Sequence, residues 1–177
     1  MRRKHYYLSG MMAVFTAVVM SLSMVACGGS DDDTEDDING SSGGGSSQKG
    51  VHQLDISFSG DTGGWSVDNF YFFSTDADGG YTKISGNDGS ESDRYIYYES
   101  FGNYSVKSDD QSWSVHCGIT LIRKSDSAKP VKINVTGKVK NKTTYTKEYE
   151  ANPQYKRVSL LVHSPSTDFA KLQNFDY

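Results

Sequence analysis

"SWSVHCGITLI", residues 112–122, decides the fold class, because its hydrophobicity alternates with a period of two. Apolar side chains occupy one set of alternate positions, and small or polar side chains occupy the other: Trp113, Val115, Cys117, Ile119 and Leu121 against Ser112, Ser114, His116, Gly118 and Thr120. Successive side chains of a β-strand point to opposite faces. The stretch therefore predicts an antiparallel-type strand with one buried and one wet face.

The same alternation continues on both sides of this stretch. "VKINVTGKVK", residues 131–140, predicts a second half-buried strand, and "NKTTYTKEYE", residues 141–150, follows after a short turn around Asn141 and Lys142, which predicts a hairpin. Further strands are expected at Leu54, Ile56 and Phe58, at "WSVDNFYFFS" (65–74), at "DRYIYYESF" (93–101), and at Val158, Leu160 and Val162. Turns rich in Gly, Asp and Ser separate them, and no window supports an amphipathic helix.

Seven to nine strands without crossover helices predict an all-β fold. The architecture expected is an antiparallel β-sandwich, Ig-like in its layers, and a small closed β-barrel is the alternative. Residues 51–177 are long enough for one such domain with a modest core.

Charge is unevenly distributed along this domain. Residues 51–110 contain 11 acidic and 3 basic residues, whereas residues 121–157 contain 10 basic and 3 acidic residues. The pattern predicts either opposite charges on two sheets or two ends, or an interleaving of cross-strand partners. Neither interpretation suggests a nucleic acid partner.

Aromatic residues form two dense runs, "FYFF" at 70–73 and "YIYY" at 95–98. Because neighbours in a strand face opposite ways, these rings cannot all enter one core. Either Tyr71 and Phe73 or Phe70 and Phe72 face outward, and the same reasoning applies to Tyr95 and Tyr97. Exposed aromatic faces mark interaction surfaces, and many β-sandwich modules hold sugar rings on them. The candidate ligand-binding residues are Tyr71, Phe73, Tyr95 and Tyr97; the alternative is that both faces of these strands are covered.

The remaining reactive residue types do not form a recognisable active site. Cys117 lies on the apolar face of its strand and is expected to fill the core, while His116 points to the other face and cannot pair with it. His52 and His163 are expected at strand ends or at the surface, without metal-ligand spacing. We predict no catalytic activity and no cofactor.

One acidic loop, "STDADGGY" at 74–81, is a weak candidate for calcium through Asp76 and Asp78. A third acid and a late Glu are missing from it. Asp and Gly also serve turn geometry, and this interpretation is preferred, so no metal is predicted.

The first 27 residues have the layout of an export signal. Arg2, Arg3 and Lys4 precede a mainly apolar stretch that ends in small residues and Cys27. This predicts a cleaved signal peptide at residues 1–26 rather than a retained transmembrane helix.

"MVAC", residues 24–27, resembles the bacterial lipobox, although Met24 departs from the usual Leu. The resemblance implies that the Cys27 thiol receives diacylglycerol and that the new amino terminus is acylated, with palmitate-type chains that anchor the protein. Residues 27–50 are acidic and then Gly/Ser-rich, which predicts a flexible tether of about 25 Å.

Two short motifs resemble signals of exported Bacteroidetes proteins. "SDDD" at 30–33 is similar to the export signal of surface-exposed lipoproteins, which implies an outer-membrane protein facing the exterior; the alternative is a periplasm-facing one with a solvated acidic tether. "DSA" at 126–128 resembles an O-glycosylation sequon with Ser127 as acceptor. Together these features predict a lipid-anchored binding or structural protein with a protein or glycan partner.

Overall fold

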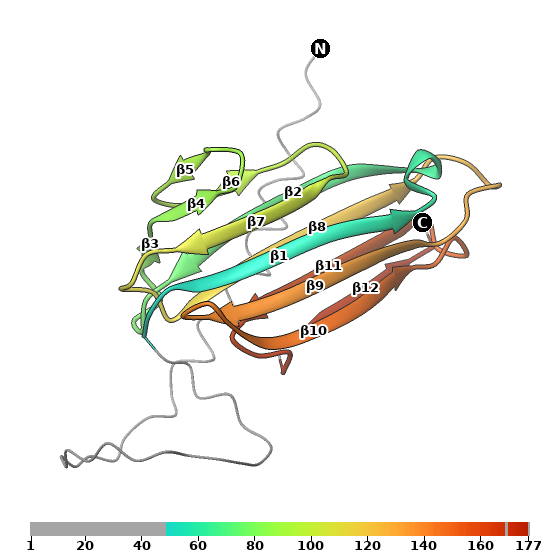
Figure 1. The fold of residues 1–177 in the computed structure, drawn as a ribbon. Coiled ribbons are helices and arrows are strands. Elements are labelled where there is room, and N and C mark those ends of the chain that lie inside the picture. Colours follow the sequence, from blue (N-terminus) through green and yellow to red (C-terminus); the bar gives the residue numbers. More distant parts are fainter. Residues whose placement is uncertain (1–48, 169, 177) are drawn as a thin grey trace, which may run out of the picture.

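The computed structural model describes residues 49–168 and 170–176, which form two antiparallel six-stranded sheets packed as a sandwich (Figure 1). The predicted all-β sandwich is confirmed. The barrel alternative is wrong, because each sheet keeps its own edge strands and the two do not close on each other. The predicted signal peptide, Cys27 and the tether up to residue 48 lie outside the described residues.

Each sheet combines strands that are consecutive in sequence, such as β9 and β10, with strands that are distant in sequence. The first sheet contains, in spatial order, β10 (Lys142–Ala151), β9 (Val131–Val139), β1 (His52–Gly60), β7 (Asn103–Ser108), β4 (Ile84–Gly86) and β5 (Glu91–Ser92). The second contains β12 (Lys171–Phe175), β11 (Arg157–Ser164), β8 (Ser114–Arg123), β2 (Trp65–Thr75) and β3 (Tyr81–Thr82), with β6 (Ile96–Tyr97) also paired to β2. The short 3₁₀ helix η1 (Thr62–Gly64) connects β1 to β2. We call the end of the sandwich at which β1 begins the near end, and the opposite end the far end.

The strand count exceeds the predicted seven to nine, because the segment between β2 and β8 is divided into short pieces. The expected strand over residues 93–101 is reduced to Ile96–Tyr97. Tyr98 N still donates to Phe70 O at 2.9 Å, but the chain then crosses to the first sheet, where β7 begins at Asn103. The ring of Tyr98 packs against that of Tyr104 with centroids 3.9 Å apart.

The hairpin between β9 and β10 forms one residue earlier than predicted. Its turn residues are Lys140 and Asn141, with φ of 48° and 65°. Positive φ at both central positions is the geometry of a type I′ turn, whose twist matches that of paired strands. Asn tolerates this conformation well, so it is the residue type that favours the observed turn.

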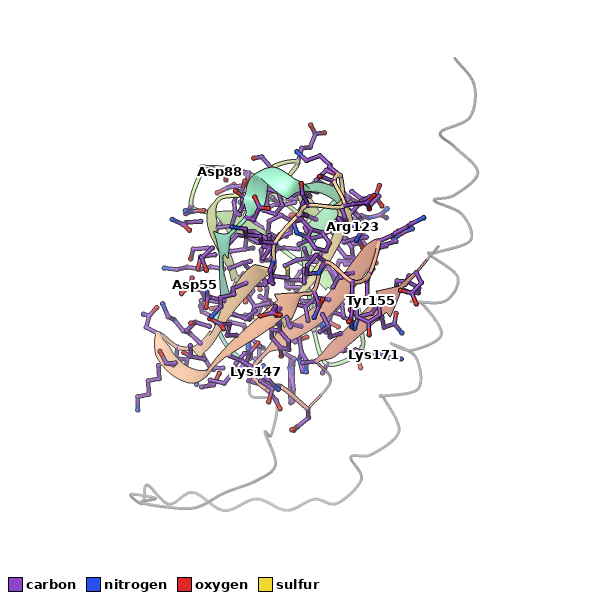
Figure 2. All side chains as sticks on the ribbon, turned by 90° about the vertical axis from the view of Figure 1, so that its right-hand side faces the viewer. Asp55, Asp88, Arg123, Lys147, Tyr155 and Lys171 are labelled. Carbon is purple, nitrogen blue, oxygen red and sulfur yellow. The ribbon has the colours of Figure 1, made fainter. Side chains whose placement is uncertain are left out.

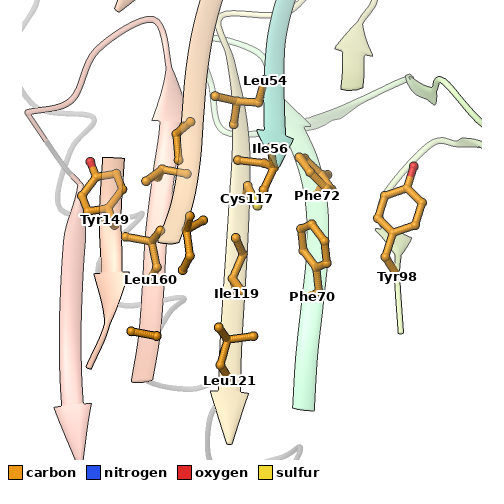
Figure 3. Packing of buried hydrophobic residues seen from close by; sticks show 14 of the residues in the cluster. Leu54, Ile56, Phe70, Phe72, Tyr98, Cys117, Ile119, Leu121, Tyr149 and Leu160 are labelled. Atoms are coloured by element: carbon orange, nitrogen blue, oxygen red, sulfur yellow. The ribbon is translucent and has the colours of Figure 1, made fainter. Parts of the chain in front are cut away.

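The core lies between the inner faces of the two sheets. Leu54 and Ile56 of β1 face Cys117 and Ile119 of β8, and Phe72 of β2 completes this layer (Figure 3). All are at most 2% exposed; the alternating pattern predicted this for the residues of β1 and β8, whereas it left the direction of Phe72 open. Cys117 is therefore a core residue, and burial raises the pKa of its thiol well above the usual value.

The outer face of β8 is less solvated than the sequence predicted. Gly118 and Thr120 are buried there, because the ring of Tyr71 lies over Gly118 and the Thr120 hydroxyl is within 3.1 Å of the Ser159 hydroxyl. His52 and His163 do lie near strand ends, but both are buried, so the surface placement expected for them is wrong.

The outer face of the first sheet shows the interleaved charges that were one of the two expectations. Lys132 Nζ lies 2.8 Å from Glu148 Oε1, and Lys138 Nζ lies 2.6 Å from Asp55 Oδ2. Both pairs join neighbouring strands. The Lys138–Asp55 pair joins the basic and the acidic segment of the sequence, whereas Lys132 and Glu148 both belong to the basic segment.

Candidate functional site

The outer face of the second sheet carries a cluster of aromatic rings toward the near end of the sandwich. We call this cluster the aromatic patch; it consists of Tyr71, Phe73, Tyr81, Tyr95 and Tyr97. Strand alternation sends their neighbours Phe70, Phe72 and Ile96 into the core instead. The four residues singled out from the sequence therefore lie together on one surface. Tyr81, which sequence reasoning missed, joins them through the pairing of Thr75 with Tyr81.

Tyr95 is the centre of the patch. Its ring centroid lies 5.3 Å from that of Tyr81, 5.5 Å from Phe73, 5.8 Å from Tyr97 and 5.9 Å from Tyr71. These separations fall in the range at which aromatic pairs attract each other beyond simple burial. The rings therefore support one another as a single surface rather than as separate side chains.

Gly118 allows the ring of Tyr71 to lie down on the sheet. The two residues are cross-strand partners in β2 and β8. A Cβ at position 118 would meet Tyr71 Cζ at 2.4 Å, which is closer than real contacts permit. Only glycine leaves room for the Tyr71 ring to lie against the backbone of β8, so Gly118 determines how closely this ring of the patch packs on the sheet.

Three tyrosine hydroxyls of the patch, those of Tyr71, Tyr95 and Tyr97, stay protonated at neutral pH. Burial raises the pKa of Tyr71 to about 12, with the nearby Cys117, Tyr97 and Tyr81 adding to the effect. Burial also raises the pKa of Tyr95, which hydrogen-bonds to the hydroxyl of Tyr81, and that of Tyr97. Tyr81 and Tyr97 are 46% and 57% exposed, so their hydroxyls can donate and accept hydrogen bonds with a ligand.

Two histidines extend the patch across the sheet. The ring of His116 stacks on Phe73 with centroids 4.5 Å apart and planes 10° apart, and His163 stacks on its other side at 5.4 Å. Ser114 Oγ lies 2.7 Å from His116 Nε2. Burial, and then repulsion from His163 and His52, lower the pKa of His116 to about 3. The imidazole is therefore neutral and belongs to the aromatic surface.

The other candidates from the sequence are not brought into this site. Asp76 Oδ1 accepts hydrogen bonds from the backbone of Asp78 at 3.0 Å and of Gly80 at 2.7 Å, which is the turn role preferred above. Within residues 49–168 and 170–176, no group of three or more His, Cys, Asp or Glu side chains is placed to hold a metal ion. Ser127 is exposed in the loop between β8 and β9, with its hydroxyl 2.7 Å from that of Ser125.

The part of the chain that the structure describes contains no helix long and apolar enough to span a membrane. Cys27, the predicted site of lipidation, lies outside that part.

Comparisons with known proteins identify the fold but no activity. No family model and no curated protein sequence matches the chain. A DUF4425 family protein from Bacteroides ovatus is structurally similar, with 21% identity and a TM-score of 0.56 over 67% of this chain and 98% of that one. A domain of unknown function, DUF4425, from Bacteroides vulgatus gives 20% identity and a TM-score of 0.55 over 66% and 96%.

A third similar structure is the calcium-bound form of a protein from Parabacteroides distasonis, with 14% identity and a TM-score of 0.47 over 80% of this chain and 100% of that one. At these identities the first two similarities show a shared fold alone, and the third is too distant to support an inference.

Proposed function

We propose that this chain is a lipid-anchored outer-membrane protein whose β-sandwich is a non-catalytic binding module. The anchor is Cys27, and the domain faces the cell exterior, with a periplasm-facing orientation as the alternative. The order of basic residues, apolar stretch, small residues and cysteine in residues 2–27 supports the anchor, and the acidic residues 31–33 support the export.

The aromatic patch carries the proposal that the domain binds a ligand. Its two most exposed rings, Tyr81 and Tyr97, stand beside three half-buried ones on a single sheet face. Clustered exposed apolar surface is costly to a soluble domain and marks interaction sites. The rings also hold one another in place, which lowers the ordering cost of binding.

A carbohydrate is the ligand class that this arrangement favours. The Tyr71 ring lies along the sheet over Gly118, and a sugar ring packs its C–H face against such a surface. The hydroxyls of Tyr81 and Tyr97 then lie at the rim, where they meet sugar hydroxyls. A protein partner, which would use the same tyrosines as anchors, is the alternative.

A glycan array tests this assignment. The full-length protein is purified in lauryldimethylamine oxide, because sugar-based detergents would compete for the site. We expect wild type to retain at least one glycan and Tyr97→Ala to weaken that binding about tenfold, the equivalent of about 1.4 kcal/mol. Leu172→Ala is the matched control, since Leu172 is an exposed apolar residue of the same sheet, 37% exposed, outside the patch. Glycan binding that survives Tyr97→Ala would rule out the aromatic patch as the site.

Protease treatment of intact cells tests the location. With a C-terminal tag, loss of the tag from intact cells places the domain outside, and protection until the outer membrane is broken places it in the periplasm. A Cys27→Ala variant that stayed membrane-bound would contradict lipid anchoring at Cys27.

A further inference from the structure

A surface hollow of about 350 Å³ lies at the far end of the sandwich, where β8 ends and β11 begins. Its lining includes four basic residues and one acidic residue: Arg123, Lys124, Lys156, Arg157 and Asp126. Figure 2 faces this end of the molecule and labels Arg123. The volume is within the range of small-ligand sites.

The four basic residues come from two dipeptides that strand pairing brings together. Arg157 is the cross-strand partner of Ile122, and Arg123 N donates to Lys156 O at 2.9 Å. "RK" at 123–124 and "KR" at 156–157 therefore lie side by side at the far end of the second sheet. Like charges held this close repel each other unless an anion joins them.

Both arginines are held in place by the fold. Arg123, whose side chain is 16% exposed, donates to Pro153 O and to Asp126 Oδ1, the latter at 2.8 Å. Arg157, 29% exposed, donates to Asp68 Oδ2 at 3.2 Å.

Asp126 and Asp68 thus offset two of the four positive charges at the hollow. Lys124 and Lys156 are exposed at its rim, so two positive charges remain in excess. Positioned guanidinium groups with ammonium groups beside them are suited to oxyanions, because guanidinium N–H groups match two oxygens at once.

We propose that this hollow binds carboxylate or sulfate groups of an anionic saccharide. The saccharide part rests on the function proposed above, whereas the oxyanion site rests on the hollow alone. Arg157 and His163 both occupy outer-face positions of β11. They are six residue steps apart along the strand, about 20 Å at roughly 3.3 Å per step. A chain of a few sugar units therefore spans the distance from His163, which is joined to the aromatic patch through His116, to the hollow.

Affinity electrophoresis with matched polysaccharides tests the proposal. The full-length protein in lauryldimethylamine oxide is run through native gels that contain polygalacturonate or its methyl-esterified form, and dextran sulfate or dextran. We expect stronger retention by at least one anionic polymer than by its neutral counterpart. The two pairs distinguish carboxylate from sulfate as the preferred group, and added salt should weaken the retention.

The test variant is Lys124→Gln/Lys156→Gln, which leaves both arginines and their carboxylate partners in place. We expect its retention constant for the anionic polymer to fall about fivefold, as for the loss of two exposed charge contacts. The control Lys107→Gln/Lys142→Gln removes the same charge from exposed positions at the near end and should retain wild-type binding. Thermal unfolding of each variant verifies that it is folded.

Several outcomes would overturn the proposal. They are no preference for either anionic polymer, full retention by the Lys124/Lys156 variant, or an equal loss in the Lys107/Lys142 control. Tyr97→Ala separates this inference from the proposed function. If the hollow variant loses retention while Tyr97→Ala keeps it, the oxyanion site stands and the aromatic patch is not the saccharide surface. If Tyr97→Ala loses retention while the Lys124/Lys156 variant keeps it, the aromatic patch is the binding site and the hollow is not.

Discussion

His116 should make the stability of the domain depend on pH, and His116→Phe should reduce that dependence. The imidazole is sandwiched between Phe73 and His163, and its pKa is lowered to about 3, chiefly by burial and then by His163 and His52. The unfolded chain binds a proton at this position near pH 6.5, but the native chain does not until about pH 3. The stabilisation is therefore fully present above about pH 6.5 and is lost as the pH falls toward 3.

The magnitude follows from the two pKa values. Between pH 7.5 and pH 5.0, a site with an unfolded pKa of 6.5 and a native pKa of about 3 costs the folded state about 2 kcal/mol. At pH 5.0 the result is the same for a native pKa of 4, because the native site is unprotonated in either case. Phenylalanine retains the stack on Phe73 and carries no proton, so the variant should lose about 2 kcal/mol less than wild type over this interval.

Urea unfolding at pH 7.5 and pH 5.0, followed by tryptophan fluorescence, measures this difference. Trp65 is 1% exposed and reports loss of the core. Other titrating groups are common to both proteins, so only the change in the pH dependence is compared. Equal losses of unfolding free energy in wild type and His116→Phe would refute the neutral state of His116 in the native protein.

Three further predictions concern the turn, the patch and the core. Gly118→Ala should push the Tyr71 ring off the sheet, since the new Cβ would meet Tyr71 Cζ at 2.4 Å. We expect weaker binding to the glycan found on the array and a loss of about 1 kcal/mol in the free energy of unfolding. The control Gly63→Ala, whose new Cβ would make an ordinary contact at 3.6 Å, should bind the glycan normally. Asp61→Ala should lower the free energy of unfolding in urea by about 1–2 kcal/mol, because the Asp61 carboxylate caps the turn by accepting hydrogen bonds from Gly64 N at 3.2 Å and Lys129 N at 2.9 Å. Asp78→Ala, at an exposed position, is the control. An equal effect of the two substitutions would contradict the capping role of Asp61. In a Cys27→Ser background, Cys117 should not react with Ellman's reagent until the protein unfolds, since burial raises the pKa of its thiol. Rapid labelling of Cys117 in the native protein would contradict its place in the core.

The sequence predicted the inner face of the sandwich well from Val115 onward, because one set of alternate positions in β8 and β9 is apolar and the other is not. Trp113, which was expected on the same buried face, precedes β8 and is only partly buried. It could not decide between Phe70 and Tyr71 as the inward residue, since both are aromatic. The choice depends on the irregular pairing between Val67 and Asn69, which shifts the register of β2 against β8. A bulge of this kind cannot be recognised reliably from the amino-acid sequence.

The missed strands are short or lack alternation. β12 reads "KLQNF", with four of its five residues exposed, and β3, β5 and β6 have two residues each. Such strands form because a neighbouring strand offers backbone partners, not because of their own hydrophobic pattern. β12 forms by pairing with β11 over Lys171–Phe175.

Sequence periodicity could not predict which residues from different strands meet at either site. Alternation placed His116 on the outer face, but its contact with Phe73 depends on the β2–β8 register. The hollow likewise needs the pairing of β8 with β11, which joins basic dipeptides 33 residues apart in sequence. Long-range register of this kind is set by the whole sandwich.

The contrast between the two outer faces locates the binding surface. On the first sheet, Lys132 with Glu148 and Lys138 with Asp55 cover the outside with ion pairs, as solubility alone requires. On the second sheet, the outside carries neutral rings at one end and an excess of positive charge at the other. Neither feature is needed to bury the core, which both sheets supply from their inner faces. A domain whose only role was to fold would place mixed charges on both faces, so the second sheet is where a ligand should be sought.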